Sequence, residues 1–359
     1  YNDRLTVPLI FFGQDEPGIY NIPAWLKILV ANRRMLKKSY EYDVVVAELG
    51  SDGPGQMKDF AYLKPDITVV TALTDEHMAF FKTLDAVAHE ELTAVGFSKQ
   101  SLINVDDSPA KYLEGQSFLG YGSQASDYRL LSRTTRSDGA QELKVQLQDK
   151  EVVLITNLLG GQGAKPLLAA AAVATICGLT PDAIAKQAST IQAVPGRMQL
   201  LTGIKNTTII DDSYNASPVA MKAALDVLYD MPVKQRIAVL GNMNEMGELS
   251  PGMHTDIGNY CDPTKLALVV TLGPDSNQYL APAALAKGCE VKTFTSPYEA
   301  GEFLKDYVQD GAAILVKGSQ NAVFSEETIK ALLANPEDTA KLVRQSPGWI
   351  KKKQAQFNR

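Results

Sequence analysis

Short apolar runs alternate with segments of helical pattern through the second half of the chain, and this alternation most limits the possible fold. Helices are expected around 219–229, 252–260, 279–287 and 298–308. The runs between them are predicted as strands: Thr207–Ile210, Arg236–Leu240, Leu266–Leu272, Glu290–Phe294 and Ala312–Val316. Strands that alternate with helices are typical of a mainly parallel sheet covered by helices. The pattern therefore predicts a complete α/β domain.

The first half shows the same alternation less regularly. Strands are predicted over Tyr42–Glu48, Ile67–Ala72 and Leu102–Val105, with a helix over Leu84–Val95 between the last two. A β-rich stretch, Tyr128–Thr156, contains a plausible hairpin turn at Ser137-Asp138-Gly139. An alanine-rich helix over Leu167–Cys177 then ends at Gly178. These elements predict a second α/β domain.

Chain length and the alternation of strands and helices predict where the domains divide. A chain of 359 residues is long enough for about two domains, and the strand–helix rhythm restarts near Pro195-Gly196-Arg197. We therefore expect two α/β domains with parallel sheets, over residues 1–198 and 199–335, and a C-terminal helical tail over 336–359. Because the chain begins at Tyr1 in what resembles the middle of a domain, we expect a fragment of a longer protein.

Charge and composition argue against several classes of protein. The formal net charge of −6 provides no basic surface, so we expect no nucleic-acid partner. No apolar run approaches the roughly 20 residues that span a bilayer, so we expect no membrane insertion. The three cysteines, Cys177, Cys261 and Cys289, fit reduced, buried thiols of a cytosolic protein better than a disulfide framework or zinc site.

The segment Asp211-Asp212-Ser213-Tyr214-Asn215-Ala216-Ser217-Pro218 directly follows the predicted strand Thr207–Ile210. In open α/β sheets, the junction from strand to helix faces the ligand crevice. Ser217 is well placed as an N-cap and Pro218 in the first turn of the next helix. A polar turn with a good cap and no ligand is the alternative.

Two further strands of the same predicted sheet also end in polar turns. Gly241 to Glu248 follow the strand Arg236–Leu240, and Lys317-Gly318-Ser319-Gln320-Asn321 follow the last strand. A single polar turn is common in proteins without function, whereas three at the carboxyl edge of one sheet favour a ligand crevice.

Candidate cation ligands lie in the first half of the chain. Glu48 ends the predicted strand Tyr42–Glu48, and His77 follows the next strand. A carboxylate and an imidazole at one sheet edge could hold a divalent cation, but a capping glutamate and a loop histidine fit the spacing equally well. Glu90 and Glu91 follow in the next predicted helix. Glu91 could point toward the same crevice, although paired helical glutamates are usually solvated surface.

The segment Gly160-Gly161-Gln162-Gly163-Ala164-Lys165-Pro166 resembles a phosphate loop only superficially. It lacks the Gly-Lys-Ser/Thr ending of a Walker A loop, and GxxxxGK[ST] occurs nowhere in the chain. N–H groups at a helix start could still bind an anion.

Several segments together resemble the Mur ligase family nearly from end to end. They are "YNDRLTVPL", "VVVAELGSDGPGQM", "KPDITVVTALTDEHMAFF", "VPGRMQ", "IIDDSYNASPVAMKAAL", "VLGNMNEMGELSPGMHTDIG" and "ILVKGS". The DDSYNA and LGxMxELG pair is typical of the branch that adds a dipeptide. The resemblance implies a central ATPase-type domain and a Rossmann-like C-terminal domain. It also implies a cytoplasmic, monomeric ligase that uses ATP and Mg2+ to join an amino acid or dipeptide, such as D-Ala-D-Ala, to a UDP-muramoyl peptide.

The resemblance also implies roles for individual residues. Glu48 and His77 match magnesium ligands. Glu91 stands where the family has a carbamylated lysine, and its carboxylate could serve directly. Residues expected at the ATP and amine sites are Arg197 for phosphates, Asp212 for ribose, Tyr214 and Asn215 bordering the nucleotide and the amine, and Lys317 with Ser319 shaping the amine pocket. For His254, which matches a family histidine, we expect a structural role.

The departures from the family pattern leave alternatives open. The family's GTNGKT/S phosphate loop is absent from the sequence, so we expect residues 1–359 alone not to turn over ATP. The segment 160–166 lacks the asparagines of the family's GxHNxxN motif, and Asn242 replaces an aspartate. A Mur-type ligase with another amino acid substrate, or a divergent homologue that binds nucleotide or peptide without catalysis, are therefore the alternatives.

Overall fold

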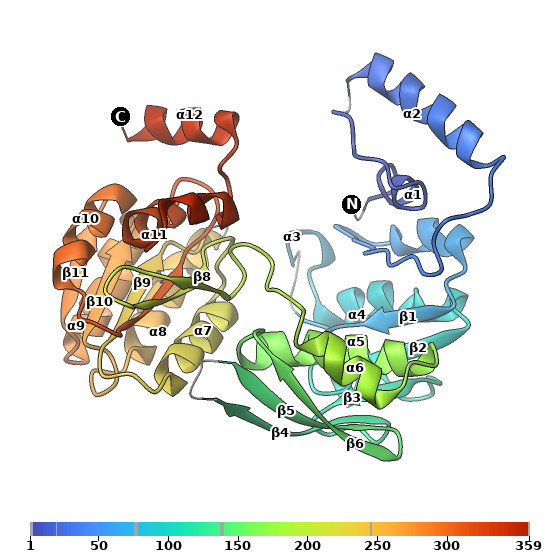
Figure 1. The fold of residues 1–359 in the computed structure, drawn as a ribbon, viewed down its shortest axis with the longest axis horizontal. Coiled ribbons are helices and arrows are strands. Elements are labelled where there is room, and N and C mark those ends of the chain that lie inside the picture. The colour runs from blue at the N-terminus through green and yellow to red at the C-terminus, as the bar shows by residue number, and fades with distance from the viewer. Residues whose placement is uncertain (1–2, 19, 75–77, 137–139, 245, 358–359) are drawn as a thin grey trace. The chain divides into compact units, whose positions relative to one another are not determined.

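The computed structural model describes residues 3–18, 20–74, 78–136, 140–244 and 246–357. They form two six-stranded sheets with strand orders β1-β2-β3-β4-β5-β6 and β11-β10-β9-β12-β8-β7 (Figure 1). The chain separates into two compact units, Tyr1–Arg129 and Leu130–Arg359, and each is described by itself below. The α/β class is confirmed. The predicted division near residue 198 stays a prediction.

The first unit contains a parallel β-layer with helices. Its helices are α1 (Val7–Ile10), α2 (Ile22–Met35), α3 (Met78–Phe81) and α4 (Leu84–Leu92), and its strands are β1 (Ile67–Val70), β2 (Gln100–Asn104) and β3 (Leu119–Gly122). Strand β2 pairs in parallel with both β1 and β3. The predicted strands near 67–72 and 102–105 and the helix from Leu84 are confirmed, whereas β3 was not anticipated.

The prediction of a strand over Tyr42–Glu48 is wrong. The backbone there is irregular, and in the described part of the chain no strand pairs with it. Val44 and Val46 are exposed. Because an apolar run becomes a strand only where a neighbour accepts its backbone hydrogen bonds, this run stays outside the sheet.

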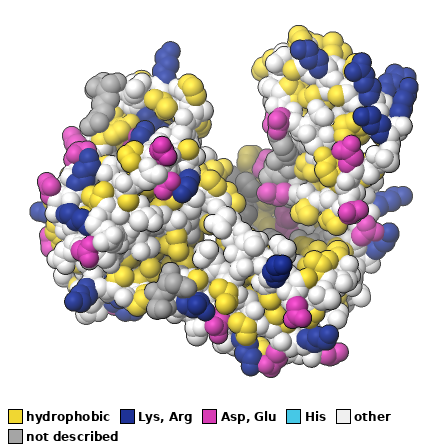
Figure 2. Space-filling view, viewed as in Figure 1, with side chains coloured by type: hydrophobic (Ala, Val, Ile, Leu, Met, Phe, Trp, Pro, Cys, Tyr) yellow, Lys and Arg dark blue, Asp and Glu magenta, His cyan; other side chains and the backbone are white. Residues whose placement is uncertain are grey.

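Helix α2 presents its apolar side chains to solvent. Asn21 caps its start, where the side chain accepts a hydrogen bond from the N–H of Ala24. None of its fourteen residues is buried, and Leu26 and Leu29 are among the exposed apolar side chains. Figure 2 shows hydrophobic and basic side chains together over this helix. The helix therefore gains little stability from packing within the first unit.

The second unit carries the remaining elements, with β4 (Tyr128–Thr135) crossing the division. Its other strands are β5 (Gln141–Leu147), β6 (Lys150–Thr156), β7 (Gln199–Thr202), β8 (Thr208–Asp212), β9 (Arg236–Gly241), β10 (Leu268–Leu272), β11 (Val291–Phe294) and β12 (Ala313–Lys317). Its helices are α5 (Gly160–Ile176), α6 (Pro181–Ala188), α7 (Pro218–Asp230), α8 (Ser250–Tyr260), α9 (Ala281–Ala286), α10 (Pro297–Tyr307), α11 (Glu326–Leu332) and α12 (Pro347–Gln356). The five predicted strands of this half are confirmed; α6 and β7 were not anticipated.

The central strands of the second sheet, β8, β9, β10 and β12, are buried on both faces. Alternate residues of β8 point into different cores, Ile210 toward α7 and Ile209 toward α10 and α11. Strands β8 to β12 run parallel, and only β7 is antiparallel at its edge. Central strands enclosed in this way read as continuous apolar runs, which explains why the sequence located them well.

Helix α5 begins at Gly160 rather than at the predicted Leu167, so the glycine-rich segment is itself helical. A side chain at Gly163 would lie 2.6 Å from the backbone of Leu158, which shows that only glycine fits at that position. A Cβ at Gly160 would lie 2.6 Å from Cγ2 of Val227 in α7, so packing against another helix requires glycine there despite its low helix propensity. The predicted hairpin turn at 137–139 lies outside the described residues.

Two general expectations can be compared with the structure. All three cysteines are free thiols, but only Cys261 and Cys289 are buried, and Cys177 is exposed. Among the described residues, no helix combines the length and apolar character needed to cross a membrane.

Candidate functional site

Three polar strand ends of the second sheet lie side by side, because β12 pairs with β8 on one side and β9 on the other. The connection after β8 leads to α7 on one face, and the connection after β12 leads to α11 on the other face. Such a divergence is where open α/β sheets form a ligand crevice. The predicted convergence of the three turns is thus borne out by the pairing.

A buried ion pair joins the first two strand ends. The Nζ of Lys317 lies 2.6 Å from Oδ2 of Asp212, and the two side chains are 3% and 10% exposed. Lys317 also donates to the carbonyl of Asn215 at 2.9 Å, and Oδ1 of Asp212 accepts the N–H of Met198 at 3.1 Å. Asp212 is therefore the last residue of β8, fixed by the neighbouring strand, and not part of a loose turn.

Arg197 and Tyr214 form the exposed part of this site. The guanidinium of Arg197 lies 4.4 Å from the centroid of the Tyr214 ring. The N–H of Tyr214 donates to the carbonyl of Gly196 at 3.0 Å, which fixes the two segments to each other. Arg197, Tyr214 and Asn215 are exposed, so a cation, a phenol and an amide face solvent above the buried pair.

Ser319 is buried and connects the strand ends. Its hydroxyl accepts the N–H of Asn244 at 2.9 Å and donates to the carbonyl of Ala216 at 3.4 Å. Its own N–H donates to the carbonyl of Asn242 at 2.9 Å. Ser319 therefore orders all three strand ends from inside.

Asn242 and His254 have structural contacts. The side-chain oxygen of Asn242 accepts the N–H of Ser276 at 2.9 Å, a contact that needs no negative charge. Nε2 of the fully buried His254 accepts the N–H of Met243 at 3.0 Å, and Nδ1 lies 2.8 Å from the carbonyl of Ser250. These contacts fit a neutral imidazole protonated at Nδ1 and agree with the structural role expected for His254.

The helix after the first turn begins as predicted. Ser217 is the N-cap of α7, and its hydroxyl accepts the N–H of Ala220 at 3.4 Å. Pro218 occupies the first helical position, where a missing N–H costs no intrahelical hydrogen bond.

Asp211 is buried on the opposite face of β8 from Asp212. Burial raises the pKa of its carboxyl group from 3.8 to about 6, against the hydrogen bonds from Ser213, and the negative charges of Glu326 and Asp212 raise it further. Oδ1 accepts the N–H of Ser213 at 3.0 Å, whereas Oδ2 has no hydrogen-bond partner among the described atoms. Below about pH 6 the neutral acid is therefore favoured in the folded state.

This raised pKa predicts a stability that falls as pH rises. Between pH 4 and 6 the folded state binds the extra proton, so the free energy of unfolding decreases through that window and stays lower above it. Asp211→Asn removes this titration, and we expect its stability relative to the wild type to increase by about 2 kcal/mol between pH 4 and pH 8. Urea denaturation across that range measures the difference. Asp256→Asn, at an exposed position, is the control. The prediction is contradicted if the stability difference between Asp211→Asn and the wild type changes with pH no more than the difference between Asp256→Asn and the wild type.

The predicted cation ligands lie in the first unit. Glu48 is exposed in the irregular segment before the glycine-rich turn, and Glu91 is half-buried in α4. His77 lies outside the described residues. The groups of Glu48 and Glu91 are carboxylates, the ligand class that Mg2+ prefers. Among the described residues, however, no three His, Cys, Asp or Glu side chains gather into a metal site.

Glu90 is not the solvated surface residue that its sequence context favoured. It is buried, and its carboxylate accepts hydrogen bonds from the hydroxyl of Ser51 at 3.1 Å, the N–H of Gly55 at 2.6 Å and the N–H of Met57 at 2.5 Å. Helical spacing provides the missed signal, because Glu90 lies three residues after the buried Val87 and four before Ala94. Glu90 therefore ties the turn after Glu48 to the helix that carries Glu91.

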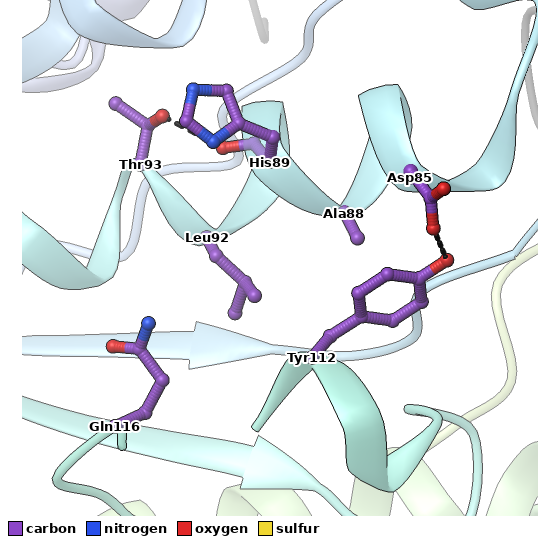
Figure 3. A pocket seen from close by; sticks show the side chains of 7 residues that line it. All are labelled: Asp85, Ala88, His89, Leu92, Thr93, Tyr112 and Gln116. Carbon is purple, nitrogen blue, oxygen red and sulfur yellow. Dashed lines mark hydrogen bonds between the residues drawn. The ribbon is translucent and has the colours of Figure 1, made fainter. Parts of the chain in front are cut away.

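A different face of α4 borders an open cavity of about 450 Å³. Figure 3 shows Asp85, Ala88, His89 and Leu92 along one side of it, facing Tyr112 and Gln116. The hydroxyl of Tyr112 donates to Asp85 at 2.5 Å, so these two polar side chains of the lining are already paired with each other. None of the described residues predicted for the site lines this cavity.

Comparison with known proteins identifies two domains. Residues 19–174 match the Mur ligase middle domain, and residues 196–320 match the glutamate ligase domain of Mur ligases. The chain is 29% identical over 315 residues to the UDP-N-acetylmuramoyl-tripeptide–D-alanyl-D-alanine ligase of Escherichia coli, covering 84% of this chain and 68% of that protein. It is 26% identical to the ligase of the same name from Bacillus subtilis, covering 82% and 65%. The chain thus spans about two thirds of the length of these curated relatives.

The fold has a close counterpart among solved structures. The MurF ligase of Thermotoga maritima in complex with ADP superposes with a TM-score of 0.71 at 22% identity, covering 90% of this chain and 72% of that one. This similarity supports the fold on which the strand-end site is built.

Proposed function

Because this chain belongs to the Mur ligase family, we propose that it is the central and C-terminal part of an ATP-dependent ligase of peptidoglycan precursor synthesis. The substrates are a UDP-muramoyl peptide and a dipeptide such as D-Ala-D-Ala. ATP transfers its terminal phosphoryl group to the peptide carboxylate and leaves as ADP. The amine then attacks the acyl phosphate, and the tetrahedral intermediate releases phosphate as the amide forms.

The buried Asp212–Lys317 pair, with the Arg197–Tyr214 stack above it, is the observation that carries this proposal. Each carboxylate oxygen of Asp212 has a second lone pair available to a ribose hydroxyl. The exposed guanidinium of Arg197 suits phosphate oxygens, since it presents a fixed fork of donors. Asn215 and Tyr214 border the nucleotide and the amine. Lys317 and Ser319 are buried and fix the backbone of this turn through the carbonyls of Asn215 and Ala216.

In the first unit, Glu48, His77 and Glu91 would hold magnesium. The ion would neutralise phosphate charge during transfer, as divalent cations do in phosphoryl-transfer enzymes. Glu91 supplies a carboxylate without the carbamylation that a lysine needs. Glu90 would place Glu48 and Glu91 through the contacts described above. We further propose that the ligase works as a monomer in the cytoplasm.

The test is phosphate release by the protein expressed from its complete gene. We expect release only when ATP, UDP-muramoyl tripeptide and D-Ala-D-Ala are all present, because the amine must capture the acyl phosphate. Glu48→Ala and His77→Ala should each lower the rate at least ten-fold and raise the Mg2+ concentration needed for half-maximal rate. Glu114→Ala, an exposed glutamate of the same unit, is the control. Unchanged rates in both site variants contradict the metal assignment.

A non-catalytic homologue is the second candidate, and the segment Gly160–Pro166 favours it. No asparagine or histidine occurs in this first part of α5. Such a protein would bind ADP yet release no phosphate with any combination of muramoyl peptide, amino acid and dipeptide. Release with another amino acid in place of D-Ala-D-Ala would instead identify a Mur-type ligase of different specificity.

A further inference from the structure

The C-terminal segment, residues 342–357, folds back onto the strand-end site. It lies beyond the matched family domain, which ends at residue 320. Leu342 is buried in the core between the second sheet and α11, and α12 ends the segment. The segment therefore adds contacts to the site that the family motifs do not include.

Arg344 holds the turn after β8 by its backbone. Its Nη2 donates to the carbonyl of Ser213 at 2.6 Å, and its Nη1 donates to the carbonyl of Tyr214 at 3.2 Å. The side chain is only 5% exposed. One guanidinium thus fixes two consecutive peptide groups next to the Tyr214 ring on which the Arg197 guanidinium stacks.

A buried carboxylate fixes Arg344 in turn. Its Nε and Nη2 donate to the two oxygens of Glu326 at 2.9 and 2.7 Å, a bidentate pair. Lys353 of α12 lies 2.8 Å from Glu326 and 2.6 Å from Glu327, and all of these side chains are buried. Two buried cations thus pair with two buried carboxylates, and the network connects α12 through Glu326 to the turn.

Val343 supports the other half of the site. A Cβ at Gly196 would lie 2.9 Å from Cγ1 of Val343 and 3.1 Å from the backbone nitrogen of Tyr214. Gly196 is thus packed between the C-terminal segment and the turn after β8. The consecutive residues Val343 and Arg344 therefore contact the two backbone segments that carry Arg197 and Tyr214.

The segment also covers the loop after Ser319. Phe324 packs its ring against Trp349 and Phe357, with centroids 6.1 and 6.4 Å apart, and Gln356 donates to the carbonyl of Ala322 at 2.7 Å. Ala322 and Phe324 have positive φ values of 65° and 50°. Non-glycine residues adopt this left-handed conformation only where surrounding contacts impose it.

We propose that Arg344 is a positioning residue for nucleotide binding, and that residues 342–357 form a brace that holds the turn after β8 in its binding conformation. The inference rests on the proposed nucleotide role of Tyr214 and Arg197. Among the described residues, the hydrogen bonds of the Arg344 guanidinium go to the backbone of the turn and to a buried glutamate.

The test compares Arg344→Met with Arg236→Met. Arg236 is the control for the backbone contact, because its guanidinium also holds a backbone carbonyl, that of Met231 at 2.6 and 3.1 Å, away from the site. Arg344→Lys is the control for the charge beside the buried Glu326. In Arg344→Met we expect the amide of Tyr214 to exchange hydrogen at least ten-fold faster and the KM for ATP to rise about ten-fold, with kcat changed less than two-fold. Arg344→Lys keeps the charge without the fork and should show an intermediate effect. Arg236→Met should change neither quantity.

Each outcome decides the proposal. A fall in kcat without a rise in KM would indicate a loss of folded protein only and would overturn it, as would unchanged exchange at Tyr214. Should Arg344→Met fail to fold, the same two measurements on Arg344→Lys decide. If the wild-type protein shows no ligation and binds no ADP, the proposed function fails. The exchange data then still test whether Arg344 holds the turn.

Discussion

Lys317→Met is expected to lower the free energy of unfolding by about 3–5 kcal/mol and to weaken ADP binding at least a hundred-fold. Removing one partner of a buried ion pair leaves the other charge desolvated and uncompensated. Here the carboxylate of Asp212 would keep the N–H of Met198 as its remaining described donor. The carbonyl of Asn215 would also lose its donor, so the backbone of the nucleotide border would be released.

Urea denaturation and ADP titration measure the two effects separately. Lys305→Met is the control, because Lys305 pairs with Glu302 at 2.8 Å on an exposed surface and should change stability by less than about 1 kcal/mol. In the double variant Asp212→Asn/Lys317→Met no buried charge is left unpaired, so we expect much of the stability to return while ADP binding stays lost. A stability loss no larger than that of Lys305→Met would contradict the buried-pair argument.

Glu90→Ala should destabilise the first unit by about 3–4 kcal/mol. The substitution removes a buried carboxylate that accepts three hydrogen bonds, and it leaves the N–H groups of Gly55 and Met57 without that acceptor. The three hydrogen bonds share one carboxylate, so their contributions are not additive. A hydrogen bond to a charged group contributes about 1.5–3 kcal/mol, and the donors left without an acceptor add about 1 kcal/mol or more. Hydrogen exchange at Gly55 and Met57 should accelerate together with the loss of stability.

Glu90→Gln refines this test. Glutamine has nearly the same shape, but its amide nitrogen would face an N–H donor, so about half of the destabilisation should remain. Glu114→Ala, at an exposed position, should lie within about 0.5 kcal/mol of the wild type. Equal stabilities of Glu90→Ala and Glu114→Ala would show that the turn after Glu48 does not depend on α4.

The sequence predicted best the elements whose side chains are buried on both faces. The strands around Ile210, Val239 and Leu315 read as continuous apolar runs because they are central strands of a covered sheet. The apolar run at Val44 and Val46 has the same composition, yet no partner strand pairs with it in the described chain. Composition therefore identifies what can be a strand, while the available partners decide what becomes one.

The candidate site was predictable where local spacing determines it. Ser217 and Pro218 follow from the strand–turn–helix order. The polar strand ends were expected at one sheet edge, but the pairing that places Lys317 beside Asp212 is known only from the structure. Arg344 gave no such signal, because it contacts Ser213 and Tyr214 across about 130 residues of chain and its own surroundings are irregular. Contacts of that kind depend on the tertiary fold and leave no periodicity in the sequence.

The position of β12 has a consequence for how this molecule is made. Strand β12 is the last of the twelve to be synthesised, yet it pairs with both β9 and β8, which have no ladder with each other in the described sheet. A nascent chain that stops before residue 313 thus carries two separate strand groups, β7–β8 and β9–β11, with open edges. Closure of the sheet, and with it the arrival of Lys317 beside Asp212, must wait until residues 313–317 have been synthesised.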